Sequence, residues 1–362
     1  MSGPVPDRAA ALADRLFGAT LGALELFSVY LGTELGLYRT LSGHGPLTSA
    51  GLAERAGIAE RYAREWLEQQ AVAGLIELDD ADAPPAGRRY RLPAEHARAL
   101  CRPDDPAHAA PFAHMLAGIG GVLPQVADAY RTGSGVPYSA YGEPFRHGQG
   151  HINRCAFSNE LAAGLLAAMP DVVAGLECAR HARIADLGCG QGWSTIALAN
   201  AFLDAWVDGL DSDPASIEDA RRHAAEAGLD GRVRFSCADA GELTGRGPYD
   251  LIVILEALHD MTRPGDVLRA AHDALGDGGT LLVVDERVAD SFTAPGDEVE
   301  RMMFGWSVTH CLPSQLAEQP SAALGTAMRA DTIRALATKA GYARVDVLPV
   351  ENDFFRLYRL WP

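Results

Sequence analysis

A glycine-rich turn is the segment of this chain whose residue types and spacing point most clearly to chemistry. In residues 184–195 an apolar strand ends at an acid, and Gly188, Gly190 and Gly192 alternate before a helix begins. Glycines at such a turn let the backbone bend sharply and lie directly against a ligand. A dinucleotide-binding fingerprint would need a further glycine where the chain has Trp193. The turn therefore predicts a ligand-binding loop of another type.

Two acidic residues follow the next two predicted strands. Residues 205–210 predict a strand that ends at Asp211, and residues 233–239 predict an alternating strand that closes on Asp239. An acid about 20 residues beyond a glycine loop is placed to bind the two hydroxyls of a ribose. A glycine loop that served only as a tight turn would leave both acids without a role. The pattern predicts a ligand that contains a ribose.

Strands and helices continue to alternate towards the C-terminus. The further predicted elements are strands at 249–255 and 278–284, a helix from Pro264, a helix over 331–341, and a last pair of strands at 345–348 and 354–360. The strand at 249–255 is apolar enough to be buried on both faces of a parallel sheet. The chain from about residue 180 is therefore expected to form an open α/β sheet covered by helices.

These motifs resemble those of class I S-adenosylmethionine (SAM) methyltransferases. The resemblance implies an α/β Rossmann-like domain with a seven-stranded, mostly parallel sheet that ends in an antiparallel hairpin. It implies SAM as cofactor and S-adenosylhomocysteine as product. No metal is expected, because the sequence shows no complete cluster of metal-ligand residues. The loop glycines would pass beneath the methionine part of SAM, Asp211 would hold the ribose, and Asp239 the adenine. The full set of implied cofactor contacts is Asp186, Gly188, Gly190, Gly192, Asp211, Ser212, Asp239, Ala240 and Glu256.

His259 is the candidate for acid–base chemistry. Methyl transfer is an in-line displacement, so an enzyme must align the reactants and then supply a deprotonated acceptor. His259 follows the fourth strand, and ligands of open parallel sheets bind beyond the carboxyl ends of the strands. An imidazole with a pKa of about 6.5 is a usable base at neutral pH. The alternative is that His259 caps the following loop and never meets a substrate.

The residues from His259 onward resemble one family within this class. Winged-helix O-methyltransferases of the caffeic-acid type carry a catalytic His-Asp-Trp here, and this chain has His259, Asp260 and Met261. In that family an acid at the end of the fifth strand orients the histidine, which implies a catalytic role for Asp285 or its neighbour Glu286. The departure at Met261 changes packing rather than acid–base chemistry. The chain also resembles a group of actinobacterial and mycobacterial winged-helix methyltransferases.

The N-terminal part predicts a different, mainly α-helical domain. Two helices at 48–56 and 59–75 precede short strands at 75–78 and 89–92, which is typical of a winged helix. Such a domain either binds DNA or serves for dimerisation and covers a substrate. Residues 47–94 contain eight acids and six arginines, so this surface is poorly suited to phosphates. We therefore expect a homodimer formed through this domain and no nucleic-acid partner.

Length and composition agree with this organisation. A chain of 362 residues predicts about two domains. The predicted boundaries are a winged-helix dimerisation domain at 1–100, a helical linker and substrate lid at 101–180, and a methyltransferase domain at 181–362 with an insertion at 287–329. The net charge of −17 also argues against a nucleic-acid partner.

The cysteines and the early apolar segment indicate where the protein is located and whether it spans a membrane. The six cysteines are scattered without a Cys-x-x-Cys pair, which is typical of reduced thiols in a cytoplasmic protein. The first residues lack the basic and apolar parts of a signal peptide. Residues 21–38 are apolar but include Glu25 and Glu34, which favours a buried or interface helix over a membrane span.

Two segments are expected to enclose the acceptor. Helices at 111–126 and 157–176 would flank a loop at 138–153 and form the roof of the pocket. His147 and His151 have the spacing of a helical metal pair, but the glycines between them favour a loop. Within 287–329, the candidate pocket residues are Met302, Met303, Trp306 and His310, because methionine and aromatic side chains adapt to flat substrates. The alternative for this segment is core or dimer packing.

The sequence therefore predicts SAM-dependent methylation of a small aromatic or otherwise planar metabolite at oxygen, with His259 as base. Nitrogen and carbon acceptors remain alternatives. A SAM-sensing transcriptional regulator is an alternative from another class, and it predicts salt-sensitive DNA binding. A third alternative keeps SAM as a bound cofactor for a rearrangement without methyl transfer.

Overall fold

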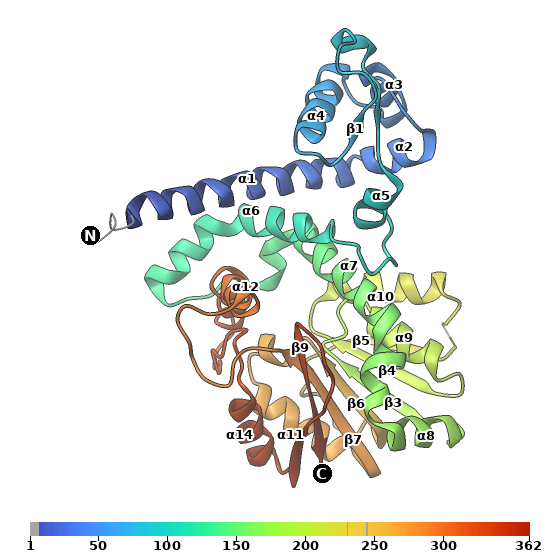
Figure 1. Ribbon diagram of the computed structural model, residues 1–362. Helices are drawn as coiled ribbons and strands as arrows, with labels where there is room; N and C mark the ends of the chain where they lie inside the picture. Colours follow the sequence, from blue (N-terminus) through green and yellow to red (C-terminus); the bar gives the residue numbers. More distant parts are fainter. Residues whose placement is uncertain (1–6, 230, 244) are drawn as a thin grey trace, which may run out of the picture. The chain divides into compact units, whose positions relative to one another are not determined.

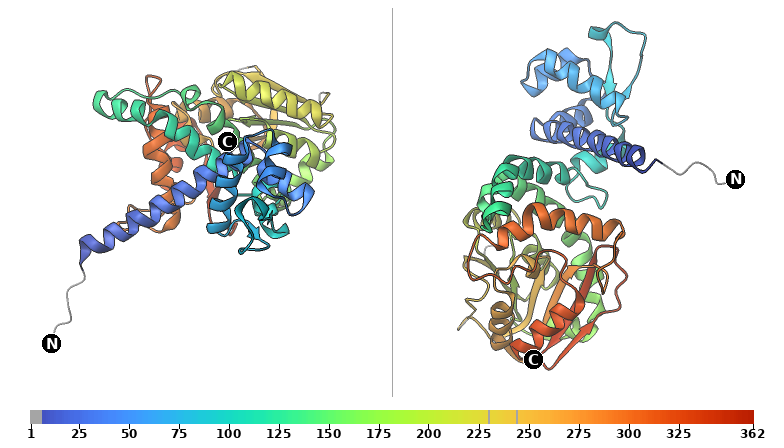
Figure 2. Two further views of the ribbon diagram at one scale, coloured as in Figure 1. Left: turned by 90° about the horizontal axis from the view of Figure 1, so that it is seen from above. Right: turned by 90° about the vertical axis from the view of Figure 1, so that its left-hand side faces the viewer.

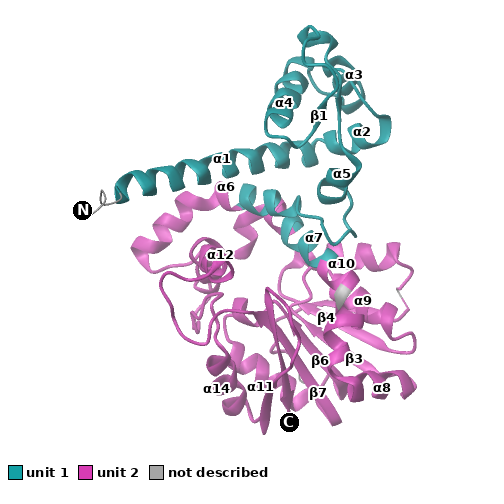
Figure 3. Cartoon of the chain, viewed as in Figure 1, with its two compact units in different colours: residues 1–118, 147–155 teal, residues 119–146, 156–362 magenta. Residues whose placement is uncertain are grey.

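The computed structural model describes residues 7–229, 231–243 and 245–362. The chain forms two compact units, drawn in different colours in Figure 3. Unit 1 comprises the chain up to residue 118 together with 147–155, and unit 2 comprises 119–146 and 156–362. Two helices, α6 (Pro111–Thr132) and α7 (Gly142–Glu160), have residues in both units.

Unit 2 is built on a seven-stranded sheet. The strands are β3 (Arg183–Leu187), β4 (Trp206–Asp211), β5 (Val233–Cys237), β6 (Tyr249–Leu255), β7 (Leu275–Glu286), β8 (Arg344–Val347) and β9 (Phe355–Trp361). Their order is β5-β4-β3-β6-β7-β9-β8. The first five are parallel, and β9 is antiparallel to both of its neighbours. This confirms the predicted Rossmann-like sheet with its terminal hairpin.

Helices cover both faces of this sheet (Figure 1). The first face carries α8 (Pro170–Cys178), α9 (Trp193–Ala201) and α10 (Pro214–Glu226), and the second carries α11 (Pro264–Ala274) and α14 (Ala330–Ala340). Side chains of β6 alternate between the two cores, with Leu251 and Val253 on the first face and Ile252 and Ile254 on the second. Burial on both faces explains why β6 is a continuous apolar run.

Unit 1 is a helical domain with a short wing, as predicted. Its complete elements are α1 (Arg8–Glu34), α2 (Leu37–His44), α3 (Ser49–Ala56), α4 (Glu60–Val72), α5 (Ala94–Cys101) and the hairpin of β1 (Glu77–Leu78) and β2 (Tyr90–Arg91). Tyr38 and Trp66 pack edge to face at 5.1 Å in its core. Leu47 pairs with Tyr90 and ties the strand of the wing to the helices.

Helix α1 presents most of its apolar side chains to solvent. Only Val29 and Gly32 within it are buried, and the helix extends beyond α2–α5 of its own unit (Figure 2). Of the two predicted alternatives for residues 21–38, a buried helix does not describe α1, which leaves an interface helix as the prediction. The segment is also not one helix, because it breaks at Gly36, which takes a left-handed conformation. By length and composition, α1 could cross a membrane, and so could the bent pair at 161–168 and 170–178, among the residues described.

The predicted loop at 138–153 is wrong, because α7 begins at Gly142 and continues through both glycines that had indicated a loop. The reason is close packing within unit 1. A Cβ atom added at Gly148 would lie 2.7 Å from both Cγ of Met115 and the carbonyl oxygen of Pro111. Gly148 therefore lets α7 approach the start of α6. A glycine inside a helix lowers the helix propensity, but the cost of a single glycine is modest.

The predicted helix at 157–176 is interrupted. After α7, residues 161–165 form a wide turn and 166–168 a tight one, and α8 starts at Pro170. A proline disfavours the helical conformation of the residue before it, and Met169 has φ −123° and ψ 65°. The proline signal was present in the sequence and marks the break.

Candidate active site

The glycine loop lies between the end of β3 and the start of α9. The amide nitrogen of Gly190 donates to Oδ2 of Asp211 at 2.8 Å, which fixes the loop beside β4. Gly190 has φ +50°, and among the described residues no heavy atom beyond its own neighbours lies within 4 Å of where its Cβ would be. A Cβ at Gly192 would instead lie 2.7 Å from the ring of Phe235. Gly190 thus faces open space, and Gly192 allows close packing.

Asp186 connects the end of β3 to the first turn of α9. Its Oδ2 accepts hydrogen bonds from Ser194 Oγ and Thr195 Oγ1, both at 2.6 Å. Its Oδ1 is buried and has no hydrogen-bond partner among the described residues. Burial raises the pKa of Asp186 to about 6. This carboxyl ties the end of β3 to the start of α9, and its support of the loop and of a ligand stays a prediction.

Asp211 and Asp239 lie beyond the carboxyl ends of β4 and β5. Asp211 accepts from the amides of Gly190 and Asp213 at 2.8 Å each, and burial raises its pKa. Asp239 is more exposed, accepts from the amide of Gly241 at 2.7 Å and pairs with Arg263 at 3.3 Å. Carboxylate oxygens can accept more than one hydrogen bond, so both acids remain usable by a ribose or a base.

These features fit SAM. The loop leaves space at Gly190, Asp186 has an unpartnered oxygen, and the two acids follow at the same edge of the sheet. Ser212 is exposed directly after Asp211, and Ala240 is partly exposed after Asp239. The individual contacts to the cofactor remain predictions.

His259 and Asp285 are brought together at the carboxyl edge of the sheet. His259 lies in a short turn, Leu258–Asp260, after β6, and Asp285 lies near the end of the adjacent strand β7. The Nδ1 atom of His259 is 2.6 Å from Oδ1 of Asp285, and both side chains are buried. The same Asp285 oxygen accepts the amide of Glu286 at 2.9 Å. This geometry leaves Nε2 of His259 as the nitrogen able to exchange a proton.

The pKa of His259 is set by opposing effects. Burial acts to lower it, but the charges of Asp285 and Asp260 and the hydrogen bond to Asp285 outweigh burial and raise it well above 6.5. Oδ1 of Asp260 lies 3.5 Å from Nε2 of His259. The imidazole is therefore readily protonated in the free protein.

Two further carboxyls, Glu256 and Glu286, lie beside this pair. Burial is the main cause that raises the pKa of Glu256 to about 7 and that of Glu286 well above 4.5. The negative charges of Asp285 and Asp260 add to this, while His259 opposes it. Glu256 also has φ +51°, a strained conformation for a residue with a Cβ, and such strain is typical of functional sites.

His310 is a predicted pocket residue with well-defined surroundings. It lies in a wide helical turn, Ser307–Cys311, and stacks on Phe145 with ring centroids 4.1 Å apart. Tyr141 meets it edge-on at 4.6 Å, and Tyr138 at 5.8 Å. Burial lowers the pKa of His310 to about 4, so this imidazole is neutral. Wide turns of this kind occur mostly at functional sites.

The other three predicted pocket residues belong to α12 (Glu298–Trp306). Met303 is buried, whereas Met302 and Trp306 are partly exposed. Their contact with an acceptor remains a prediction.

One cluster has ligand atoms close enough for a metal ion. Atoms of His259, Asp260 and Cys311 lie within 4.8 Å of one another, and this is the group of that kind found among the described residues. Burial raises the pKa of the Cys311 thiol to about 12. The expectation that the protein uses no metal stays a prediction.

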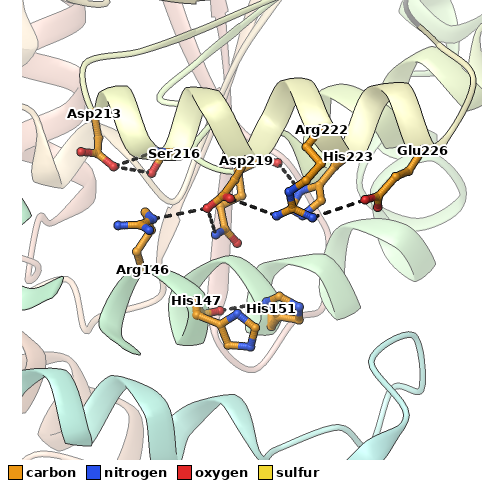
Figure 4. A network of polar contacts seen from close by, with 10 residues as sticks. Arg146, His147, His151, Asp213, Ser216, Asp219, Arg222, His223 and Glu226 are labelled. Carbon is orange, nitrogen blue, oxygen red and sulfur yellow. Dashed lines mark hydrogen bonds and ion pairs between the residues drawn. The ribbon is translucent and has the colours of Figure 1, made fainter. Parts of the chain in front are cut away.

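The prediction that His147 and His151 lie in a loop is wrong. Both are on α7, four residues apart, and their rings stack with centroids 3.8 Å apart (Figure 4). Nδ1 of His151 lies 3.0 Å from the carbonyl oxygen of His147. The expectation that this pair binds no metal stays a prediction.

Sequence reasoning missed a polar network that holds the glycine loop, centred on Asp219 of α10 (Figure 4). Asp219 Oδ2 accepts from the side chain of Gln191 at 2.8 Å and from Arg146 at 3.3 Å, and its Oδ1 accepts from Arg222 at 2.9 Å. These partners hold the pKa of Asp219 below its usual value, although burial opposes them. The polar Gln191 between two loop glycines was the available signal.

Comparisons with known proteins agree with this fold. Residues 179–327 match the family model of a methyltransferase domain, and residues 22–102 match that of an Rv2258c-like winged HTH domain. The chain therefore contains a methyltransferase domain of the SAM-dependent class and a winged-helix domain, as the resemblance had implied.

The chain is also similar to methyltransferases of known name and of solved structure. The trans-aconitate 2-methyltransferase of Streptomyces coelicolor is 36% identical over 137 residues, which cover 38% of this chain and 43% of that protein. The chain thus spans less than half of the length of this curated relative. The mitomycin 7-O-methyltransferase MmcR has a TM-score of 0.65 at 22% identity and covers 98% of each chain. Human N-acetylserotonin methyltransferase in complex with SAM has a TM-score of 0.71 at 17% identity, covering 100% of this chain and 99% of its own. At these identities the structures show the shared fold.

Proposed function

We propose that the protein transfers a methyl group from SAM to an oxygen of a small, planar acceptor, with His259 as the general base. The observation that carries the proposal is the 2.6 Å contact between Nδ1 of His259 and Asp285. It fixes the imidazole at the sheet edge that also carries the glycine loop, where ligands of such sheets bind.

The proposed reaction needs one proton transfer and one displacement. SAM, when bound, supplies a methyl group on a positively charged sulfur. The acceptor hydroxyl gives its proton to Nε2 of His259, and its oxygen attacks the methyl carbon. The carbon–sulfur bond breaks, and sulfur keeps the electron pair as S-adenosylhomocysteine. Asp285 holds the imidazole and stabilises the imidazolium that forms. Glu286 takes part as a second buried carboxyl beside the pair of His259 and Asp285.

The cofactor would be held by the residues described above. Gly190 provides space for the methionine part, Asp186 supports the loop, and Asp211 and Asp239 bind the ribose and adenine. Glu256 at the end of β6 completes the set. The proposal includes no metal.

We further propose that the partner of unit 1 is a second copy of this chain. Exposed apolar side chains follow α1 over most of its length: Leu12, Leu16, Phe17, Leu21, Leu24, Phe27 and Leu31. A continuous exposed apolar surface of this kind marks an interaction site. A homodimer would cover it, and a cytoplasmic location is proposed with it.

The regulator alternative is opposed by the charges of the winged helix. The arginines of α4 are already paired with acids of the same helix, Arg61 with Glu65 and Arg64 with Glu60. Arg88 near the wing pairs with Glu68. Because these carboxylates would face the phosphates together with the arginines, DNA binding is not favoured.

The test is turnover of purified protein with SAM and a panel of phenols, hydroxy acids and amines. Release of S-adenosylhomocysteine is followed for the wild type and for His259→Ala, each after dialysis against EDTA. Release with a phenol that is lost in the variant supports the proposal. Release only with amines would favour N-methylation, and SAM binding without any release would favour the regulator or the non-methylating role.

A further inference from the structure

The proposed mechanism gives no task to the second histidine of the site, His310. It is 2% exposed, and its Nδ1 lies 3.4 Å from Sγ of Cys311. Its Nε2 is buried and has no hydrogen-bond partner in the described part of the chain. Leaving a buried polar atom unsatisfied is unfavourable, so such an atom calls for an explanation. A ligand with a donor group would supply the missing partner.

The surroundings hold this ring in a fixed position. Phe145 stacks on one side, and the edge-on Tyr141 has its hydroxyl bonded to the carbonyl oxygen of Thr309 at 2.9 Å. The thiol of Cys311, the next residue, also contacts His259. His310 therefore belongs to the same site as the proposed base, and its aromatic neighbours suit a flat acceptor.

Carboxyl groups outnumber basic groups around the site. Four buried carboxyl oxygens lack a hydrogen-bond partner among the described residues: Glu256 Oε1, Asp260 Oδ1, Asp285 Oδ2 and Glu286 Oε2. The charge that acts most strongly on Glu286 is that of Glu256, followed by those of His259, Asp285 and Asp260. Glu256 meets the charges of the same last three residues, and of these only the protonated His259 is a cation. Such a site attracts hydrogen-bond donors and repels anions.

We infer that the methyl acceptor is an uncharged molecule with two hydrogen-bond donors, of which one is methylated beside His259 and the other donates to Nε2 of His310. This inference rests on the proposed function and adds the chemical class of its substrate. An acceptor carrying a carboxylate would meet the carboxyls of Glu256 and Glu286, and the cation beside them, His259, is already paired with Asp285. His310 is a binding residue that selects the acceptor by its second O–H or N–H.

The experiment compares matched acceptors with matched variants. The acceptors share one ring and carry two hydroxyls, one hydroxyl, or two hydroxyls and a carboxylate. The proteins are the wild type, His310→Phe, which keeps a flat ring without an acceptor atom, and His310→Gln, whose amide oxygen can accept. Thermal unfolding and SAM binding are measured for all three, because a correctly folded variant is needed for the comparison.

We expect the wild type to lose tenfold or more in kcat/KM when the second hydroxyl is removed, and a similar factor when the carboxylate is added. His310→Phe should methylate the one-hydroxyl and two-hydroxyl acceptors equally well, and His310→Gln should regain part of the discrimination. Because His310→Phe removes an unsatisfied atom, its Tm should be no lower than that of the wild type without acceptor.

Three results would overturn the inference. They are a wild type that treats the one-hydroxyl and two-hydroxyl acceptors alike, a His310→Phe variant that keeps the discrimination, and a preference for the carboxylated acceptor. A purely structural His310 would give equal losses for all acceptors. Failure of the proposed function itself looks different, because then no acceptor yields S-adenosylhomocysteine with any of the proteins.

Discussion

One oxygen of Asp285 joins His259 to the backbone of strand β7. Oδ1 accepts from the imidazole at 2.6 Å and from the amide of Glu286 at 2.9 Å, while Oδ2 is buried without a partner among the described residues. The carboxylate cannot rotate without losing both hydrogen bonds. The orientation of the proposed base is therefore tied to the sheet.

Replacing Asp285 with asparagine should lower kcat about 100-fold or more, because general-base catalysis contributes about 10²–10⁴-fold. The wild-type rate should rise with pH through a pKa above 6.5, since His259 must lose its proton to act as base. Loss of the Asp285 charge lowers that pKa, so the rise should move to lower pH in the variant. The pH profile of kcat/KM measures this.

Asp277→Asn is the matched control for that substitution. Asp277 lies on the same strand and is exposed, so its replacement should change neither the rate nor the profile. An Asp285→Asn variant with wild-type turnover would show that His259 does not depend on this carboxylate.

Asp219→Asn should weaken SAM binding about tenfold. Asparagine keeps the shape of the aspartate side chain but removes the negative charge to which Gln191, Arg146 and Arg222 donate hydrogen bonds. The glycine loop is therefore held less firmly. Calorimetry with SAM gives the affinity. Glu226→Gln is the control, since Glu226 lies on the same helix and pairs with Arg222 but not with Gln191 among the described residues (Figure 4). Equal affinities for the two variants would contradict a role of the network in the loop.

The sequence predicted the sheet because parallel strands that are buried on both faces appear as continuous apolar runs. The resemblance to the caffeic-acid-type family implied that Asp285 or Glu286 orients His259, and Asp285 makes this contact because the ends of β6 and β7 meet at one edge. The course of α7 was not predictable, since Gly148 is explained only by the approach of Met115. Asp219 was missed for a similar reason, because its partner Gln191 lies 28 residues away.

The contribution of Glu256, Glu286 and His259 to the stability of the protein should fall as pH rises from 5 to 8. Glu256 and Glu286 have raised pKa values in the folded state, so the native protein holds protons that the unfolded chain, at about 4.3, has released. The raised pKa of His259 acts in the same direction, since its stabilisation is present below about 6.5 and is lost as pH rises through the folded-state pKa.

Glu286→Gln removes part of this dependence. We expect the variant to be more stable than the wild type at pH 8 and to differ little at pH 5. Urea unfolding at the two pH values measures the difference. Glu218→Gln, on the exposed side of α10, should have no pH-dependent effect. A Glu286→Gln variant that is less stable at pH 8 would mean that the carboxylate is well paired.

The apolar surface of α1 should control the oligomeric state. Changing Phe17, Leu21 and Leu24 to glutamate should convert a dimer to a monomer, as measured by light scattering, because the exposed apolar area is then replaced by repelling charges. The same three changes at solvent-exposed Ala10, Ala11 and Ala13 serve as a control. A wild type that is monomeric, or that requires detergent or lipid vesicles, would contradict the proposed homodimer.

The proposed function requires that His259 removes a proton from the acceptor hydroxyl. Its most direct test is the rate of S-adenosylhomocysteine release with one phenolic acceptor across pH 6 to 10, for the wild type and His259→Ala. Removing the base should cost about 100-fold or more at pH 7 and progressively less at high pH, where the acceptor ionises without help. SAM affinity should be unchanged. Equal turnover of the two proteins at pH 7 would contradict the claim and leave alignment alone as the source of catalysis.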